Sequence, residues 1–336
     1  MLKIDVFNHF MPQPYFKKME AQSPDDKNLV KRMRAVPAVY DLDVRFRHMD
    51  LFENYVQVLS LAAPPIETYG DRGTDMAKLA NDSLAELVAK YPARFPGFIA
   101  SLSLNDPDAA VAEAQRAVKD LGASGIQLFS QILGKPLDRP EFGPIFDLMA
   151  ELDLPIFLHP ARLGKFSDYK TEDKSHYEIW WCFGWPYETS AAMARLVFSG
   201  LFDKHPSIKI VTHHMGAMIP FFSGRVGPGW DQLGTRTTDE DYSLLLEKLA
   251  KRPVDYFKMF YADTALSGET SGATQCGLNF FGADHVLFAT DTPFDPEKGT
   301  AFIRSIIETV DNLAISQADR KAIYEDNARK LLKLKI

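Results

Sequence analysis

The sequence predicts an α/β protein built as a single parallel (β/α)8 barrel. Eight short apolar runs rich in β-branched and aromatic residues recur along the 336 residues. Several of the intervening stretches space their apolar residues by three and four, as amphipathic helices do. Strands that alternate with helices in this way are typical of a parallel barrel, and such barrels reach this length as one domain. We therefore expect residues 1–336 to form one unit.

The expected elements follow the order that a barrel requires. Helical spacing continues into a last segment, for which Ser316 is the expected N-cap. The alternation is interrupted after the first strand by a long polar segment rich in Met, Lys and Arg, which we expect to fold over the barrel mouth as an insertion. The expected strands are 2–7, 57–63, 95–102, 124–130, 154–160, 208–214, 255–263 and 285–291, the helices 75–91, 108–121, 141–153, 189–205 and 316–334, and the insertion 12–43.

Composition excludes several classes of partner. The net charge is −7 and the basic residues form no long run, which argues against a nucleic-acid partner. No apolar run is long enough to span a bilayer, so we expect a soluble protein that contacts no membrane and resides in the cytoplasm. Cys182 and Cys276 are too few for a disulfide framework, and we expect both to be free, buried thiols.

Histidine and aspartate gather where the predicted strands end. In parallel barrels the chemistry lies at the C-terminal ends of the strands, and a single polar residue there would more often serve packing. Imidazole nitrogens together with a carboxylate oxygen suit a divalent transition metal such as Zn²⁺. The alternative is a rim of neutral, hydrogen-bonded polar groups without a metal. The residues at the predicted strand ends are His9, His159, His213, His214, Asp263 and Asp291.

Four segments resemble the metal-dependent amidohydrolase superfamily, and in particular its aminocarboxymuconate-semialdehyde decarboxylase branch. They are IDVFNHFMP (4–12), LPIFLHP (154–160), IVTHHMGAMIPFFSGR (210–225) and LFATDTPF (287–294), and the similarity extends over nearly the whole chain. The resemblance implies one divalent metal ion, Zn²⁺ or alternatively Mn²⁺, bound by His9, His159 and Asp291.

The resemblance also implies catalytic roles for His214 and Asp291. His214 takes the place of the family's general base, or of the group that orients metal-bound water, because it precedes the Gly-containing turn in HMGAMIP. His213 would point to the opposite face if the strand stayed regular. We therefore expect His213 to pack behind the site.

Phe7 departs from the family pattern. The family places His or Glu two residues before the ligand His9, and phenylalanine has no lone pair to donate. On a strand Phe7 should face the barrel interior together with His9. The substitution therefore implies either weaker metal binding or loss of the metal.

Two arginines and a tryptophan match family positions that bind substrate. Arg45 and Arg225 imply an acidic substrate, because arginine binds carboxylate through a planar fork, and Arg225 matches a residue that the family supplies to the neighbouring subunit. This implies a homodimer or a larger homo-oligomer. Trp181 would stack on a flat ligand, whereas Trp180 belongs to the core. Asp263 matches a family position but has no assigned chemical role.

These residues favour a non-oxidative decarboxylase of a small aromatic or conjugated carboxylic acid. The same groups would also serve a hydrolase or hydratase acting on a similar acidic substrate. A third interpretation is a binding barrel that has lost catalysis. Phe7 favours it. Against it stands the retention of His159, His214, Arg225 and Asp291.

Overall fold

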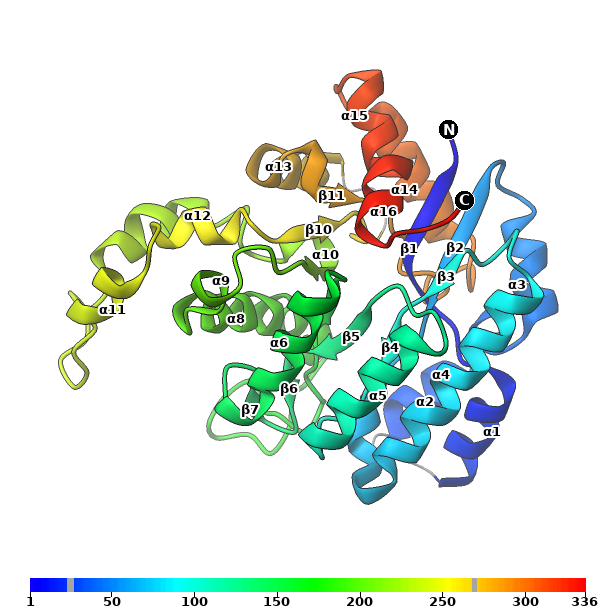
Figure 1. The fold of residues 1–336 in the computed structure, drawn as a ribbon, viewed down its shortest axis with the longest axis horizontal. Coiled ribbons are helices and arrows are strands. Elements are labelled where there is room, and N and C mark those ends of the chain that lie inside the picture. Colours follow the sequence, from blue (N-terminus) through cyan, green and yellow to red (C-terminus); the bar gives the residue numbers. More distant parts are fainter. Residues whose placement is uncertain (23–26, 268–270) are drawn as a thin grey trace.

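The computed structural model describes residues 1–22, 27–267 and 271–336, and its elements are drawn in Figure 1. A parallel strand overlaps each of the eight predicted strand segments. Of the expected strand 255–263, however, only Tyr261–Asp263 is a strand, because Pro253 begins a short helix that ends at Phe257. Strand pairing runs in the order β1-β2-β3 and β4-β5-β8-β9-β10-β11. Ile99 separates β3 from β4, and its N–H donates to the Leu59 carbonyl at 2.8 Å. The barrel closes between the first and last strands, where the Val6 N–H donates to the Phe288 carbonyl at 3.0 Å. The strands are β1 (Lys3–His9), β2 (Tyr55–Ser60), β3 (Gly97–Phe98), β4 (Ala100–Ser101), β5 (Ile126–Phe129), β8 (Ile156–His159), β9 (Ile210–Thr212), β10 (Tyr261–Asp263) and β11 (Val286–Leu287); a hairpin adds β6 (Gln131–Ile132) and β7 (Lys135–Pro136).

Helices surround the barrel, and the one N-cap that the sequence predicted, Ser316, is confirmed. The Asp106 side chain accepts from the Ala109 N–H at 3.0 Å at the start of α5, and Ser316 caps the last helical segment through the Asp319 N–H. The barrel helices are α4 (Gly73–Lys90), α5 (Pro107–Lys119), α6 (Gly143–Leu152), α8 (Gly184–Phe198), α12 (Pro253–Phe257), α13 (Ser271–Phe281), α14 (Ala301–Asn312), α15 (Gln317–Lys321) and α16 (Asn327–Leu331), with short helices α7 (Ile179–Cys182), α9 (Leu201–Lys204), α10 (His213–Gly216) and α11 (Ser243–Lys248).

The segment after β1 forms α1 (Gln13–Gln22), α2 (Lys27–Arg34) and the start of α3 (Leu42–Met49), and residues 23–26 lie outside the described part. In Figure 1 α1 and α2 lie at the end where β1 finishes. Tyr15 and Met19 pack with Tyr69 and Met76 in a second buried cluster. Arg32 donates to the Phe294 carbonyl, beyond the C-terminal end of β11. The division of the chain into one domain with an insertion at 12–43 stays a prediction.

The interior of the barrel is apolar below the polar strand ends. Val6, Phe157, Val211 and Leu287 belong to one buried cluster, which Leu331 of α16 joins. An apolar floor of this kind keeps water away from the polar groups above it, and electrostatic interactions there are stronger than in water.

Neither cysteine is buried, contrary to our expectation. Both thiols are free, but Cys182 is exposed and Cys276 is partly exposed. Cys182 ends the short helix α7, which has no buried residue and lies on the surface. Within the described ranges no helix combines the length and the apolar character needed to cross a membrane. Cytoplasmic residence stays a prediction.

Candidate metal and active site

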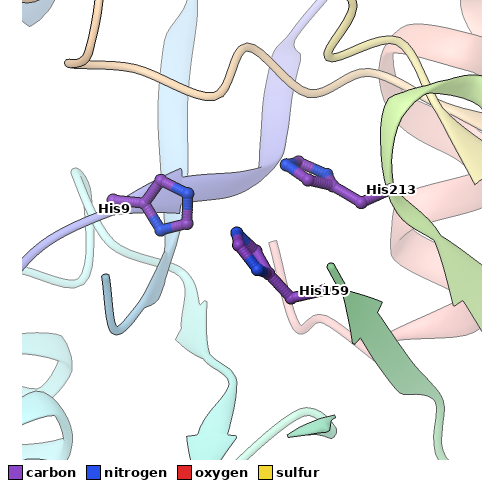
Figure 2. A group of neighbouring side chains, drawn as sticks. All are labelled: His9, His159 and His213. Atoms are coloured by element: carbon purple, nitrogen blue, oxygen red, sulfur yellow. The ribbon is translucent and has the colours of Figure 1, made fainter. Parts of the chain in front are cut away.

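Three imidazoles from three strands face a common space at the barrel rim (Figure 2). His9 ends β1, His159 ends β8, and His213 follows β9 directly. The ring centroids of His159 lie 5.4 Å from His9 and 5.3 Å from His213. One ring nitrogen of each histidine lies within 4.8 Å of the others, and all three side chains are buried. These distances suit a group of ligands around one cation.

The other nitrogen of each imidazole is held by an oxygen of the protein. Nδ1 of His9 lies 3.3 Å from the Leu61 carbonyl, and Nδ1 of His159 lies 2.7 Å from the Pro160 carbonyl. For His213 the acceptor is a carboxylate, because Nδ1 lies 2.5 Å from Oδ2 of Asp263. When a cation takes the place of the proton on Nε2, an acceptor at Nδ1 keeps the remaining proton there, so that the Nε2 lone pair is free to bind the cation.

Asp291 brings a carboxylate to the same space. Its Oδ1 lies 2.9 Å from Nε2 of His9 and 3.4 Å from Nε2 of His213. Burial alone would raise the pKa of Asp291, but the hydrogen bonds from the histidines outweigh burial and hold this pKa well below its ordinary value. Asp291 is therefore a carboxylate at neutral pH and can act as a ligand.

His213 does not pack behind the site as the sequence predicted. The strand ends at Thr212, and His214 and Met215 adopt left-handed conformations with φ of 56° and 54°. Alternation of side chains therefore stops one residue before the pair, and the rings of His213 and His214 lie 4.0 Å apart. Gly216 completes the turn at φ 73°, where a Cβ would meet the Phe281 ring at 2.5 Å. Both histidines consequently face the rim.

His214 lies at the edge of the site. Its side chain is 16% exposed, and its Nε2 lies 3.6 Å from Oδ2 of Asp291. Its Nδ1 has no hydrogen-bond partner within the part of the chain that the structure describes. Burial, and then the neighbouring His213, lower the pKa of His214. This imidazole is available to a bound molecule.

Asp263, which sequence reasoning left without a role, orients both histidines. Oδ2 contacts Nδ1 of His213, and Oδ1 accepts from the backbone N–H of His214 at 3.0 Å. Burial would lower the pKa of His213, but the charge of Asp263 and its hydrogen bond raise it to about 10. A carboxylate at the end of the seventh strand, opposite a histidine pair, was the signal in the sequence.

Phe7 faces the interior, as predicted. Its side chain is buried, and its ring centroid lies 4.3 Å from His213 and 5.2 Å from His9. The same ring stacks on Phe157 at 5.7 Å. Phe7 therefore forms the apolar base of the histidine cluster.

Arg45 is buried and hydrogen-bonded within the protein, and its role in binding substrate stays a prediction. The side chain is buried, and its guanidinium donates to Gln57 Oε1 at 2.7 Å, to the carbonyls of His9 at 2.7 Å and Ala38 at 3.1 Å, and to Asn8 Oδ1. These acceptors engage all three of its nitrogens. The helical phase of α3 turns Arg45 inward, where it supports the backbone of His9.

Trp181 lies on the short surface helix α7, and its stacking on a ligand stays a prediction. It is 44% exposed and donates from Nε1 to Glu178 Oε2 at 2.9 Å. Trp185 instead approaches the site, with its ring 5.7 Å from that of His159. Trp180 is half-buried and packs on Trp185 at 5.6 Å, while Trp181 lies 6.4 Å from Trp185. The spacing of four between Trp181 and Trp185 was the available signal.

Arg225 is exposed and lies beyond the rim in the segment Arg225–Gly229. Its guanidinium lies 5.8 Å from the centroid of the Phe222 ring. Among the described residues Arg225 has no ion-pair partner. Its action in a neighbouring subunit stays a prediction.

Known proteins are similar to this chain in sequence and in fold. Residues 4–334 match the family described as Amidohydrolase. The gamma-resorcylate decarboxylase of Polaromonas sp. (strain JS666) is 36% identical over 309 residues, which cover 87% of this chain and 88% of that protein. The 2-amino-3-carboxymuconate-6-semialdehyde decarboxylase of Dictyostelium discoideum is 30% identical over 259 residues, which cover 76% of this chain and 67% of that protein.

Solved structures agree with these matches. The dihydroxybenzoic acid decarboxylase of Polaromonas sp. JS666, with bound manganese and the inhibitor 2-nitroresorcinol, superposes with a TM-score of 0.76 at 29% identity. The match covers 100% of this chain and 98% of that one. The resemblance to decarboxylases of the amidohydrolase superfamily is thus confirmed over the whole barrel. The chain belongs to the amidohydrolase family.

Proposed function

We propose that the protein is a metal-dependent, non-oxidative decarboxylase of a small aromatic or conjugated carboxylic acid. The observation that carries this proposal is the group of His9, His159 and His213 at the barrel rim, with Asp291 2.9 Å from His9. It is supported by relatives that are decarboxylases of such acids, including gamma-resorcylate and dihydroxybenzoic acid.

The residues present fit a divalent ion. Ring nitrogens and a carboxylate oxygen are the donors that Zn²⁺ accepts, and Zn²⁺ is the ion we propose. Mn²⁺, which the Polaromonas structure contains, is the alternative that metal analysis must distinguish. A divalent ion held here supplies a Lewis acid that polarises an oxygen of the substrate.

His214 is placed to handle the proton that decarboxylation needs. The bond between the substrate carbon and its carboxylate breaks, the electron pair stays on that carbon, CO₂ leaves, and the carbon takes up a proton. The partly exposed ring of His214 stands beside Asp291 and has a nitrogen without a partner among the described residues. Proton transfer by a positioned side chain accelerates such a step by about 10² to 10⁴.

The working form is proposed to be a homodimer or a larger homo-oligomer. Arg225 is exposed, and Phe221 nearby is 78% exposed, which is unusual for a large aromatic side chain. A second copy that covers this region would shield the phenylalanine and bring Arg225 to the substrate carboxylate of its neighbour.

A product assay with metal analysis tests the proposed function. Protein purified without chelators should carry about one divalent ion per chain and release CO₂ from 2,6-dihydroxybenzoate or from another acid in a panel of aromatic and muconate-type acids. Chelation should abolish the release, and the resident ion should restore it. Products formed without CO₂ would indicate a hydrolase or hydratase, and full activity in metal-free protein would refute the metal mechanism.

A further inference from the structure

Position 7 lacks a side chain that can donate a lone pair to a metal ion, but a histidine lies beside it in space. The family resemblance places a metal-binding side chain where Phe7 stands, so two imidazoles and Asp291 would be left to hold the ion. The Phe7 ring lies directly against His213, with 4.3 Å between the ring centroids. His213 therefore occupies space beside the position from which the usual donor is missing.

His213 has the orientation of a ligand. Its Nδ1 is tied to Asp263 at 2.5 Å, and its Nε2 points toward Asp291, whose Oδ1 lies 3.4 Å away. A carboxylate that holds the distal nitrogen of a histidine is the usual support of a metal-bound imidazole. A buried histidine that serves only packing would have no need to direct its second nitrogen into a group of donors.

The three histidines of Figure 2 share one pattern. Each has Nδ1 against a protein oxygen, and each offers a nitrogen within 4.8 Å of the other two. His214 differs, because its Nδ1 has no partner among the described residues and its ring is partly exposed. The pattern thus separates His213 from its neighbour in the sequence.

We propose that His213 is a metal ligand and replaces the donor lost at Phe7, so that the ion is held by His9, His159, His213 and Asp291. This inference rests on the proposed function insofar as that function requires a divalent ion. It leaves His214 as the residue that meets the substrate. The donor that this chain lacks at position 7 is thus replaced by one that follows β9.

The first test compares matched variants of the two adjacent histidines by metal content and affinity. Loss of the hydrogen-bond partner of a metal ligand typically costs about 10- to 100-fold in metal affinity. His213→Ala should exceed that loss because it removes the ligand itself. His214→Ala should keep the ion. Zinc affinity is measured by competition with a chromophoric chelator, and circular dichroism verifies folding. Stoichiometric, tightly bound metal in folded His213→Ala would overturn the inference.

A second variant asks whether the replacement is specific to position 7. The double variant Phe7→His/His213→Ala returns a donor to that position and should recover metal that His213→Ala has lost. A double variant that folds but stays metal-free would overturn the replacement of one donor by the other.

X-ray absorption on the unaltered, zinc-loaded enzyme avoids the risk that a variant misfolds. Outer-shell scattering should count three imidazoles around the ion, whereas two would overturn the inference. Purified protein that binds no ion would refute the proposed function together with this inference. An ion held by two imidazoles, in an enzyme that still releases CO₂, would refute this inference alone.

Discussion

Asp263 shows how one side chain can decide what its neighbour does. Its carboxylate accepts from His213 Nδ1–H and keeps that proton in place, so that the other nitrogen can lose its proton and offer a lone pair to a cation. Asp263→Asn can turn its amide N–H toward Nδ1, which moves the imidazole proton to Nε2 and blocks coordination. We expect metal affinity to fall by about 10- to 100-fold with little change in fold, measured by chelator competition.

Asp284→Asn is the matched control for that substitution. Asp284 also lies beside a histidine nitrogen, His285 Nδ1 at 3.3 Å, but its side chain is 80% exposed and the pair is remote from the rim. The metal affinity of the Asp284→Asn variant should equal that of the unaltered protein. Equal affinities in both variants would contradict the positioning role of Asp263.

Arg45 gives a prediction about stability. Because its donors are buried and engaged by Gln57, Asn8 and two carbonyls, Arg45→Lys should leave several acceptors without a partner. We expect the free energy of unfolding to fall by roughly 3 kcal/mol, measured by urea denaturation.

The exposed Arg47 of the same helix provides the control for Arg45. Arg47→Lys should change the free energy of unfolding by less than about 0.5 kcal/mol. Comparable unfolding curves for the two lysine variants would contradict the structural role of Arg45.

At the scale of elements, the positions of the strands could be predicted from the sequence, but the turn that ends β9 could not. Buried parallel strands are recognisable as short β-rich apolar runs, so each strand of the barrel overlaps a predicted segment, although the first part of the segment 255–263 is helical. The turn after Thr212 was not predicted, because His214 and Met215 take left-handed conformations that non-glycine residues rarely adopt. The direction of the Arg45 side chain could not be predicted either, since nothing in the sequence of its helix shows which face packs on the barrel.

The segment after β2 carries a buried acid whose ionisation opposes folding. Glu67 is 2% exposed, and burial raises its pKa to about 7 from an ordinary 4.5. The folded state therefore binds this proton more tightly than the unfolded state does, so stability should fall as the pH rises from about 4.5 through about 7.

Glu67→Gln should remove that dependence. Gln can keep the acceptor for the Leu104 N–H, which now donates to Oε1 at 3.1 Å. The variant should be more stable than the unaltered protein above about pH 7, by up to roughly 3 kcal/mol, and closer to it at pH 4.5. Thermal unfolding at both pH values measures the difference, and a gain that is larger at pH 4.5 would have the wrong sign.

At the scale of the whole molecule, the proposed contribution of Arg225 across subunits predicts complementation. Arg225→Ala chains and His214→Asn chains should each be nearly inactive. A mixed dimer has one site with both defects and one with neither, so decarboxylase activity should partly return when subunits exchange. Exchange followed by mass spectrometry, without recovery of activity, would show that Arg225 acts within its own chain or not at all.

The contact between the first and last strands of the barrel also determines when a newly made chain can assemble the metal site. His9 lies at the end of the first strand, and its partner Asp291 follows the last strand, 282 positions later in the sequence. Two backbone hydrogen bonds join the two ends. The Asp291 N–H donates to the Phe7 carbonyl at 3.1 Å, and the His9 N–H donates to the Thr292 carbonyl at 2.8 Å. During synthesis the amino-terminal part leaves the ribosome first and must wait for almost the entire polypeptide. A nascent chain stalled before residue 291 therefore cannot bring Asp291 to His9.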